Sequence, residues 1–200
     1  MDEQKRDWEG LYREQAVETM PWYYPDLDPD FETVIAELGI DSGRVLDMGT
    51  GPGTQAMALA KMGFEVTATD ISGTAVELAA AKAKELGLSI DFRQDDIRHT
   101  LLDETFDYIF DRGLFHTLAP SERHVYVENV YNLLSKGGRL FLKCFSHKEK
   151  RPGGPHRLSP QDIEDNFGAC LTIVSIADTV FPGTDPPVRR ALFAVMKKAV

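Results

Sequence analysis

Glycines and acidic residues gather in the segment Asp47-Met48-Gly49-Thr50-Gly51-Pro52-Gly53, which joins an apolar run to an Ala-rich one. Glycines let the backbone adopt dihedrals closed to other residues and approach a ligand closely. A dinucleotide-binding loop usually reads G-x-G-x-x-G, whereas this segment reads G-x-G-x-G with an acid just before it. A carboxylate there would repel a pyrophosphate and attract an ammonium group. The segment therefore indicates a nucleoside ligand with a zwitterionic tail, the alternative being a tight turn without a ligand.

Asp70 ends the next apolar run, FEVTATD, and is followed by Ile71. In an open α/β sheet, ligands bind at the carboxyl ends of the strands, and an acid at the tip of the second strand can accept hydrogen bonds from both ribose hydroxyls. Together with the glycine segment, Asp70 predicts a nucleoside site at that edge of the sheet.

A second group of reactive side chains follows the apolar run FDYIFD, where Asp111, Arg112 and Gly113 come in succession and His116 lies shortly after. Either the strand simply ends at the surface there, or reactive side chains sit at its tip. Arg112 could bind an anionic acceptor or a ligand carboxylate, Asp111 could orient Arg112 or line the pocket, and His116 could act as a base. The alternatives are an exposed Asp111–Arg112 salt bridge, worth under ~1 kcal/mol, and a histidine that only packs.

The elements that position these residues alternate along the chain. Apolar runs typical of strands are separated by stretches with helical spacing at 54–62, 73–86 and 121–134. Such alternation predicts parallel strands joined by crossover helices. The runs LTIVSIADTVF and RRALFAVMKKA are joined by PGTDPP without a helix, which predicts an antiparallel hairpin. The predicted fold is α/β: a Rossmann-like, doubly wound sheet of seven strands, mostly parallel with an antiparallel C-terminal hairpin, and helices on both faces.

Apolar spacing also predicts which helical residues face the core. In the 73–86 helix the inward residues should be Val76, Ala79, Ala83 and Leu86. A further helix should start at Asp28-Pro29, an N-cap followed by a proline at the first position. Before it, an amphipathic helix at 5–16 is followed by TMPWYYPDLDPD, whose prolines exclude regular structure.

Four segments, VLDMGTGPG, VTATDIS, FRQDDI and LLSKGGRLFL, resemble in order and spacing the class I methyltransferases that depend on S-adenosyl-L-methionine (AdoMet). The resemblance covers about residues 30–198 and implies AdoMet as the cofactor. On the matching positions, the methionine end would be held by Asp47, Met48, Gly49, Thr50, Gly51 and Gly53, the ribose by Asp70, and the adenine by Ile71, Asp96 and Ile97. Asp95 departs from the small residue that the family usually has there, so the choice between Asp95 and Asp96 stays open.

The segments DRG, WEGLYRE and MPWYYPDLDP resemble one branch of that family, the thiopurine, tellurite-resistance and thiol/halide methyltransferases. In that branch an aromatic, proline-containing segment covers the cofactor. The resemblance therefore implies an arm, residues 1–28, over the site and a methyltransferase domain, 29–200. Trp22, with Tyr23 and Tyr24, could stack on the cofactor or roof the acceptor pocket, or anchor the arm instead.

The resemblance to this branch implies transfer of a methyl group to a small molecule, with a thiol, another chalcogen or a halide favoured as acceptor. Such a transfer is an in-line displacement in which the protein mainly positions the acceptor and excludes water. No Asn-Pro-Pro-Tyr-type tetrapeptide follows FDYIFD, so the signature of amide and base N-methylation is absent. Two alternatives remain: a non-catalytic AdoMet-binding module, and a nicotinamide-dependent oxidoreductase, which the glycine spacing and the hairpin disfavour.

Composition excludes several other classes. The net charge of -10 argues against a nucleic-acid partner, which requires clustered Lys and Arg. Cys144 and Cys170, both in strand-like runs, match no zinc or haem pattern, and we expect no metal. We expect neither a secretory leader nor a membrane span, and a cytoplasmic location. The loop SHKEKRPGGPHR could be a mobile lid or a solvated loop, and the oligomeric state is not indicated.

Overall fold

Within the residues that the computed structural model describes, 6–183 and 188–200, seven strands form one sheet in the order β3-β2-β1-β4-β5-β7-β6. Their bounds are β1 Arg44–Met48, β2 Glu65–Asp70, β3 Asp91–Gln94, β4 Phe106–Arg112, β5 Leu134–Phe145, β6 Thr172–Phe181 and β7 Arg189–Lys197. Strands β1 to β5 run parallel, whereas β7 is antiparallel to both β5 and β6. The predicted α/β class and its antiparallel C-terminal hairpin are confirmed.

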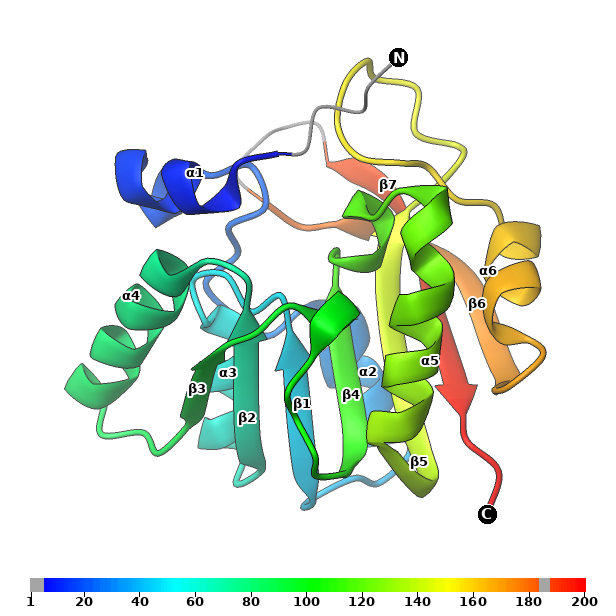
Figure 1. The fold of residues 1–200 in the computed structure, drawn as a ribbon, viewed down its shortest axis with the longest axis horizontal. Helices are drawn as coiled ribbons and strands as arrows, with labels where there is room; N and C mark the ends of the chain where they lie inside the picture. Colours follow the sequence, from blue (N-terminus) through cyan, green and yellow to red (C-terminus); the bar gives the residue numbers. More distant parts are fainter. Residues whose placement is uncertain (1–5, 184–187) are drawn as a thin grey trace.

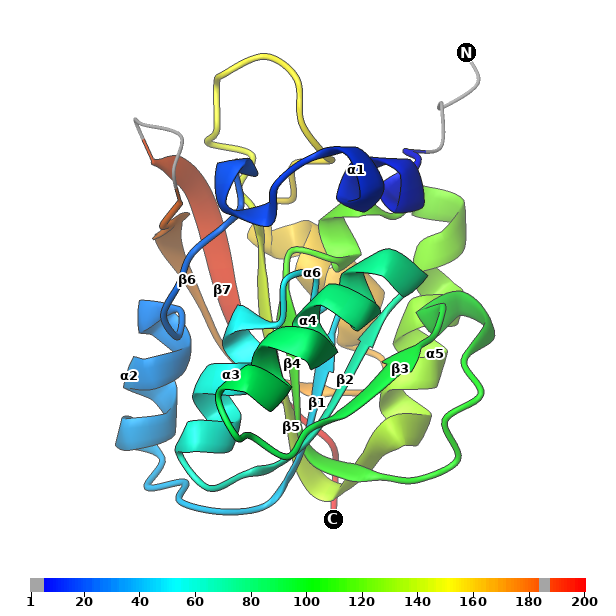
Figure 2. The same ribbon diagram turned by 90° about the vertical axis from the view of Figure 1, so that its left-hand side faces the viewer.

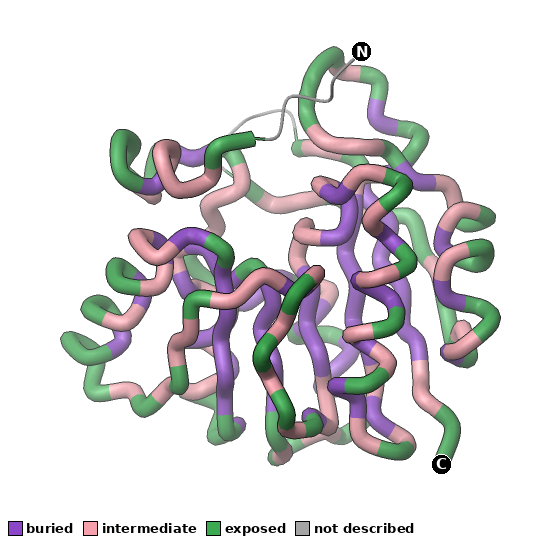
Figure 3. Tube along the Cα trace, in the orientation of Figure 1, coloured by how far each residue is buried: buried purple, intermediate pink, exposed green. Residues whose placement is uncertain are grey.

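Helices cover both faces of this sheet (Figures 1 and 2). The covering helices are α2 Pro29–Glu37, α3 Thr54–Lys61 and α4 Gly73–Glu85 on one face, and α5 Arg123–Leu133 and α6 Pro160–Phe167 on the other. Helix α1, Trp8–Glu14, and four short 3-10 turns, Val17–Thr19, Ile97–His99, Phe115–Thr117 and Pro120–Glu122, lie outside these layers. Because both faces are covered, the central strands are buried along most of their length (Figure 3).

The helix starts follow from capping residues. Asp28 accepts a hydrogen bond from the Asp30 N–H and is followed by Pro29, which fits the predicted start of α2. Ser159 and Asp162 cap the start of α6 reciprocally. Helix α2 therefore begins where the sequence predicts.

The prediction for α4 was partly wrong. Its buried stripe is Ala75, Ala79 and Ala83, spaced four residues apart, with Ala75 packed against Tyr12 and Met20 and Ala79 beside Gly53. Leu86, at the C-cap, is 47% exposed because the helix has ended there. The expectation for Cys170 also fails, since it lies between α6 and β6, whereas Cys144 is buried in β5 as expected.

The carboxyl ends of β1, β2, β4 and β5 meet at one edge of the sheet, the upper edge in Figure 1. Helix α1, the loop 146–157 and the carboxyl end of β6 lie at the same edge. This edge therefore brings together every segment in which the sequence predicted chemistry.

Candidate functional site

The glycine segment forms the turn between β1 and α3. Gly49, Gly51 and Gly53 all have positive φ, at 64°, 51° and 74°, a conformation that other residues rarely adopt. Space is also restricted: a Cβ on Gly49 would lie 2.8 Å from Leu114 Cδ1, and one on Gly53 would lie 2.8 Å from Ala79 Cβ. Both the backbone conformation and the packing therefore require glycine, in a turn where Gly49 is exposed and Gly51 and Gly53 are buried.

Two buried acids flank this turn. Asp47 is 1% exposed, and its Oδ2 accepts a hydrogen bond of 2.6 Å from Thr50 Oγ1. Asp70 accepts hydrogen bonds of 2.9 Å from the Gly51 and Ser72 N–H groups, one on each oxygen. A carboxylate oxygen has two acceptor positions, so Asp70 can also accept from two ribose hydroxyls. Ile71, next to it, is 40% exposed and offers an apolar surface to a planar base.

The electrostatics of these acids fit a cationic ligand. Burial, together with the negative charges of Asp111 and Asp70, raises the pKa of Asp47 to about 7. Burial also raises the pKa of Asp70. A sulfonium or ammonium group at this edge would favour both ionised forms. The residues present therefore fit AdoMet, which carries both cationic groups and a ribose diol.

The predicted adenine contacts lie after β3. The Asp95 N–H donates to the Asp70 carbonyl, and Asp95 Oδ1 accepts from the Leu101 N–H. Asp96 caps the 3-10 turn and forms an ion pair of 2.7 Å with Arg98, which lowers the pKa of Asp96. Ile97 is buried. The Asp96 carboxylate is thus held from within the chain, and the contacts of Asp95, Asp96 and Ile97 with adenine stay predictions.

Asp111, at the tip of β4, is fully buried and organises the turn that follows it. Its Oδ1 accepts hydrogen bonds from the N–H groups of Gly113 and Leu114, and its Oδ2 from the Phe115 N–H and the Tyr126 hydroxyl. These four donors fill the acceptor capacity of a carboxylate. Burial nevertheless raises the pKa of Asp111 to about 6. The structure thus places Asp111 as the centre of the 111–115 turn.

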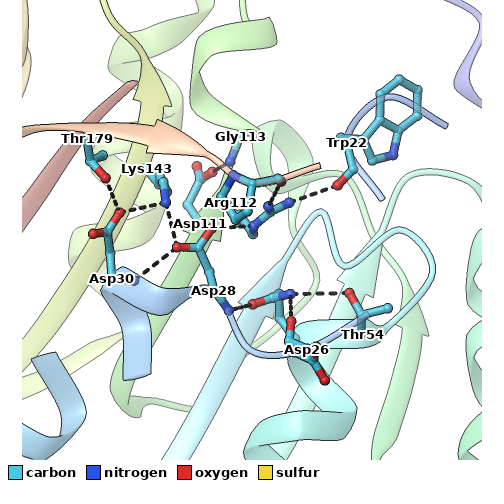
Figure 4. A network of polar contacts seen from close by, with 12 residues as sticks. Trp22, Asp26, Asp28, Asp30, Thr54, Asp111, Arg112, Gly113, Lys143 and Thr179 are labelled. Carbon is cyan, nitrogen blue, oxygen red and sulfur yellow. Dashed lines mark hydrogen bonds and ion pairs between the residues drawn. The ribbon is translucent and has the colours of Figure 1, made fainter. Parts of the chain in front are cut away.

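Arg112 points the other way, toward the arm (Figure 4). Its Nε donates to Asp28 Oδ2 at 2.7 Å, its Nη1 to the Trp22 carbonyl at 2.9 Å, and its Nη2 to the Pro182 carbonyl at 2.7 Å. The partner of this buried guanidinium is therefore Asp28, where the sequence had suggested Asp111. Whether Arg112 also binds an acceptor or the cofactor carboxylate stays a prediction.

His116 is buried in the 3-10 turn after Gly113. Its Nδ1 accepts a hydrogen bond of 2.8 Å from the Phe145 N–H, and its ring packs against Phe145 and Phe181 at centroid distances of 4.6 and 5.8 Å. Burial, with the charges of His156 and Arg123, lowers the pKa of His116 to about 3. The ring is therefore neutral at neutral pH and carries its proton on Nε2. This arrangement makes His116 a hydrogen-bond donor, and its role as a base stays untested.

The arm contributes two residues that the sequence pattern did not mark as functional. Tyr12 is buried, and its hydroxyl lies so close to the glycine turn that a Cβ on Gly51 would be 2.5 Å from it. Glu9 accepts hydrogen bonds from the Ser72 and Thr74 hydroxyls, both at 2.7 Å, and from the Thr74 N–H. Glu9 and Tyr12 are three residues apart in α1 and so share a helix face, which was the available signal.

Trp22 packs edge-on against Trp8 at 5.8 Å, and the Arg6 guanidinium lies over both rings. Trp22 thus lies in the arm at the same edge as the glycine turn, and its stacking on the cofactor stays a prediction.

The loop 146–157 is tied to the fold through Glu149, which accepts hydrogen bonds from the Arg151 and Arg190 N–H groups. In residues 6–183 and 188–200, no group of three or more His, Cys, Asp or Glu could hold a metal ion. No helix in these same segments has the length and apolarity that crossing a membrane requires.

Comparisons with known proteins agree with this site. Residues 45–138 match a family model described as a methyltransferase domain. The 2-heptyl-1-hydroxyquinolin-4(1H)-one methyltransferase of Mycobacteroides abscessus is 30% identical over 178 residues, which is 85% of this chain and 78% of that protein. A probable thiol methyltransferase of Arabidopsis thaliana is 29% identical over 78% of this chain and 69% of its own length.

Among solved structures, one described as "Conversion of a Disulfide Bond into a Thioacetal Group during Echinomycin Biosynthesis" is 25% identical with a TM-score of 0.83 and covers 96% of this chain and 91% of its own. TehB from Haemophilus influenzae shares the fold, with a TM-score of 0.70 at 17% identity, over 84% of this chain and 62% of its own. The chain belongs to the class I AdoMet-dependent methyltransferases. It is an enzyme whose cofactor is AdoMet, and the non-catalytic and nicotinamide-dependent alternatives are set aside.

Proposed function

We propose that this methyltransferase acts on a small-molecule acceptor that ionises without help from the protein, a thiol or another chalcogen first of all. The observation that carries this proposal is the state of the two candidate bases at the β4 tip. Asp111 already accepts from four donors, and the His116 Nδ1 already accepts from the Phe145 N–H. A hydroxyl or amine acceptor benefits from a base, whereas a thiol supplies its own thiolate.

The residues at the upper edge would then bind and orient. AdoMet supplies an activated methyl group on its sulfonium. The glycine turn and Asp47 would hold the methionine end, Asp70 the ribose, and Ile71 the adenine ring. Trp22 and Tyr12 would cover the cofactor from the arm and exclude water, which strengthens the electrostatic contacts of the site.

The acceptor would lie against a partly aromatic wall at the β4 tip. Phe145 and Phe181 lie 5.4 Å apart, each packed against His116, and Gly113 lies beside the His116 ring, with an added Cβ only 3.3 Å from Nε2. An N–H donor beside apolar rings suits a soft anion such as a thiolate. The printed names of two similar proteins, a probable thiol methyltransferase and a disulfide-to-thioacetal conversion, support a sulfur acceptor.

The test is a panel of small thiols of graded pKa, assayed for S-adenosylhomocysteine and methylated product as a function of pH. We expect the acid limb of kcat/KM to follow the pKa of each thiol. His116→Gln, which can still accept from the Phe145 N–H, should keep that limb. An acid limb at one pH for every thiol, abolished in His116→Gln, would show that the protein supplies the base and would refute this proposal.

A second candidate acceptor is a hydroxyl on a heteroaromatic ring nitrogen. It is favoured by the hydroxyquinolone methyltransferase of Mycobacteroides abscessus, which is 30% identical. Such a hydroxyl is more acidic than an alcohol, so it too dispenses with a base, and its flat ring suits the aromatic wall. A hydroxyquinolone and iodide belong in the same panel, and iodide turnover should not vary with acceptor ionisation.

A further inference from the structure

A network of buried charges joins the arm to the tips of β4 and β5 (Figure 4). Lys143 Nζ lies 2.5 Å from Asp28 Oδ1 and 2.6 Å from Asp30 Oδ2, and Arg112 holds the other oxygen of Asp28. Arg112 and Lys143 are neighbours on adjacent strands. Two cations thus face two acids at the first turn of α2.

The network is buried to a degree unusual for charged groups. Asp28 is 0% and Lys143 is 1% exposed. Buried ion pairs are weak contributors to net stability because each charge loses its hydration. Their dependable effect is geometric, since any movement would leave a charge buried without its partner. The network therefore fixes the start of α2, and the arm before it, against the sheet.

Arg112 extends this fixation across the upper edge. Its Nη1 donates to the carbonyl of Trp22 in the arm, and its Nη2 donates to the carbonyl of Pro182 after β6. The two segments touch each other as well, because a Cβ on Gly183 would lie 2.6 Å from the Pro21 carbonyl oxygen. One guanidinium thus holds two segments together beside the β4 tip, where the acceptor would bind.

Asp28 also reaches the cofactor side. Its N–H donates to Gln55 Oε1 at 2.7 Å, and Gln55 Nε2 donates to the Asp26 carbonyl. Gln55 lies in the first turn of α3, directly after the glycine turn. The arm is therefore attached both to the cofactor turn and, through Arg112, to the acceptor side.

We propose that Arg112 is a positioning residue that closes the arm onto Pro182 and Gly183, directly after β6, and thereby limits the size of the acceptor. Lys143, Asp28 and Asp30 hold the arm in place for this closure. The proposal rests on methyl transfer at this edge and not on the identity of the acceptor atom.

Two variants test the closure from opposite sides. Arg112→Lys keeps the charge next to Asp28, but an ammonium cannot reproduce the planar fork that reaches both carbonyls. Gly183→Ala leaves the charge network intact and places a methyl group against the Pro21 carbonyl. The controls are Arg93→Lys, an exposed ion-pair residue of β3, and Val188→Ala, an exposed residue near the start of β7.

The first measurement is hydrogen exchange of the arm at saturating AdoMet, which requires no acceptor. We expect amides in 20–24 to exchange roughly tenfold faster in both test variants, the effect of losing about one good hydrogen bond, and to be unchanged in both controls.

The second measurement is kcat and KM for a small and a bulky thiol. The KM of the small thiol should rise, and the ratio of kcat/KM for the bulky thiol to kcat/KM for the small thiol should increase.

Unchanged exchange in both test variants would overturn the closure. Faster exchange with an unchanged bulky-to-small ratio would overturn its role in acceptor size. If no thiol is methylated by the wild type, the proposed acceptor fails while the exchange result still decides the closure, and the ratio is then measured with hydroxyquinolones of different chain length.

Discussion

Replacing Tyr126 by Phe tests whether Asp111 is a structural centre or a catalytic acid–base group. The Tyr126 hydroxyl donates to Asp111 Oδ2 at 2.6 Å, and both residues are fully buried. A hydrogen bond to a charged group contributes about 1.5–3 kcal/mol. The ring itself stays, so no cavity term adds to this loss. We expect the free energy of unfolding at neutral pH to fall by about 1.5–3 kcal/mol, measured by urea denaturation.

The matched control is Tyr131→Phe in the same helix, where the ring face contacts Lys198 Nζ at 4.2 Å centroid distance. It should cost less than about 0.5 kcal/mol, as surface substitutions do. Removing the Tyr126 hydroxyl also removes an interaction that lowers the pKa of Asp111. If Asp111 were the base, the acid limb of kcat/KM would therefore move to higher pH. A Tyr126→Phe variant with unchanged stability and a shifted acid limb would refute the structural role.

Two further predictions concern the cofactor, and a third concerns the attachment of α1. Asp70→Ala should weaken AdoMet binding by roughly tenfold or more in calorimetry, because hydrogen bonds from the ribose hydroxyls to a charged acceptor are lost, whereas Asp91→Ala, an exposed acid of β3, should not. The pKa of Asp47 is raised to about 7, and a bound cation favours its ionised form, so AdoMet binding should release protons. The affinity for AdoMet should therefore increase from about pH 6 to 8 in the wild type but not in Asp47→Asn. The pKa of Glu9 is lowered to about 2, chiefly by the hydrogen bonds from Ser72 and Thr74. The stabilisation that the Glu9 carboxylate contributes is therefore present above its unfolded-state pKa and is lost as the pH falls toward 2. Glu9→Gln should release α1, which would be seen as faster proteolysis of the arm at neutral pH.

The sheet and the cofactor edge could be predicted because their signals are local. Strand periodicity, the glycine spacing and the Asp70 position each lie within a few residues of sequence, and parallel strands necessarily bring their carboxyl ends to one edge. The start of α2 was predictable for the same reason, since Asp28 caps within one turn. The face of α4 was predicted less well because Val76 is the more apolar residue, whereas the buried residue is Ala75, which packs against Tyr12 and Met20 of the arm, far away in sequence.

The partner of Arg112 could not be predicted, because the partner lies far away in sequence. Arg112 and Asp111 are adjacent and invite a pairing, but successive side chains on a strand point to opposite faces. Asp111 turns into its own loop, and Arg112 reaches Asp28, which local pattern had already explained as a helix cap. Lys143 did carry a signal: a lysine within the apolar run LFLKCF is rarely buried unless it is paired.

Four aspartates at this edge form two groups that cannot be told apart from the residue type alone. Asp28 and Asp30 are matched by the cations of Arg112 and Lys143, and the consequence is a fixed arm. Asp47 and Asp70 have raised pKa values, because burial opposes their charge more than their neighbouring donors favour it. A cationic cofactor is the ligand that relieves this cost. Asp28 and Asp30 are thus paired within the chain, whereas Asp47 and Asp70 are the acids that we expect a cationic cofactor to pair, a division set by burial and by partners distant in sequence.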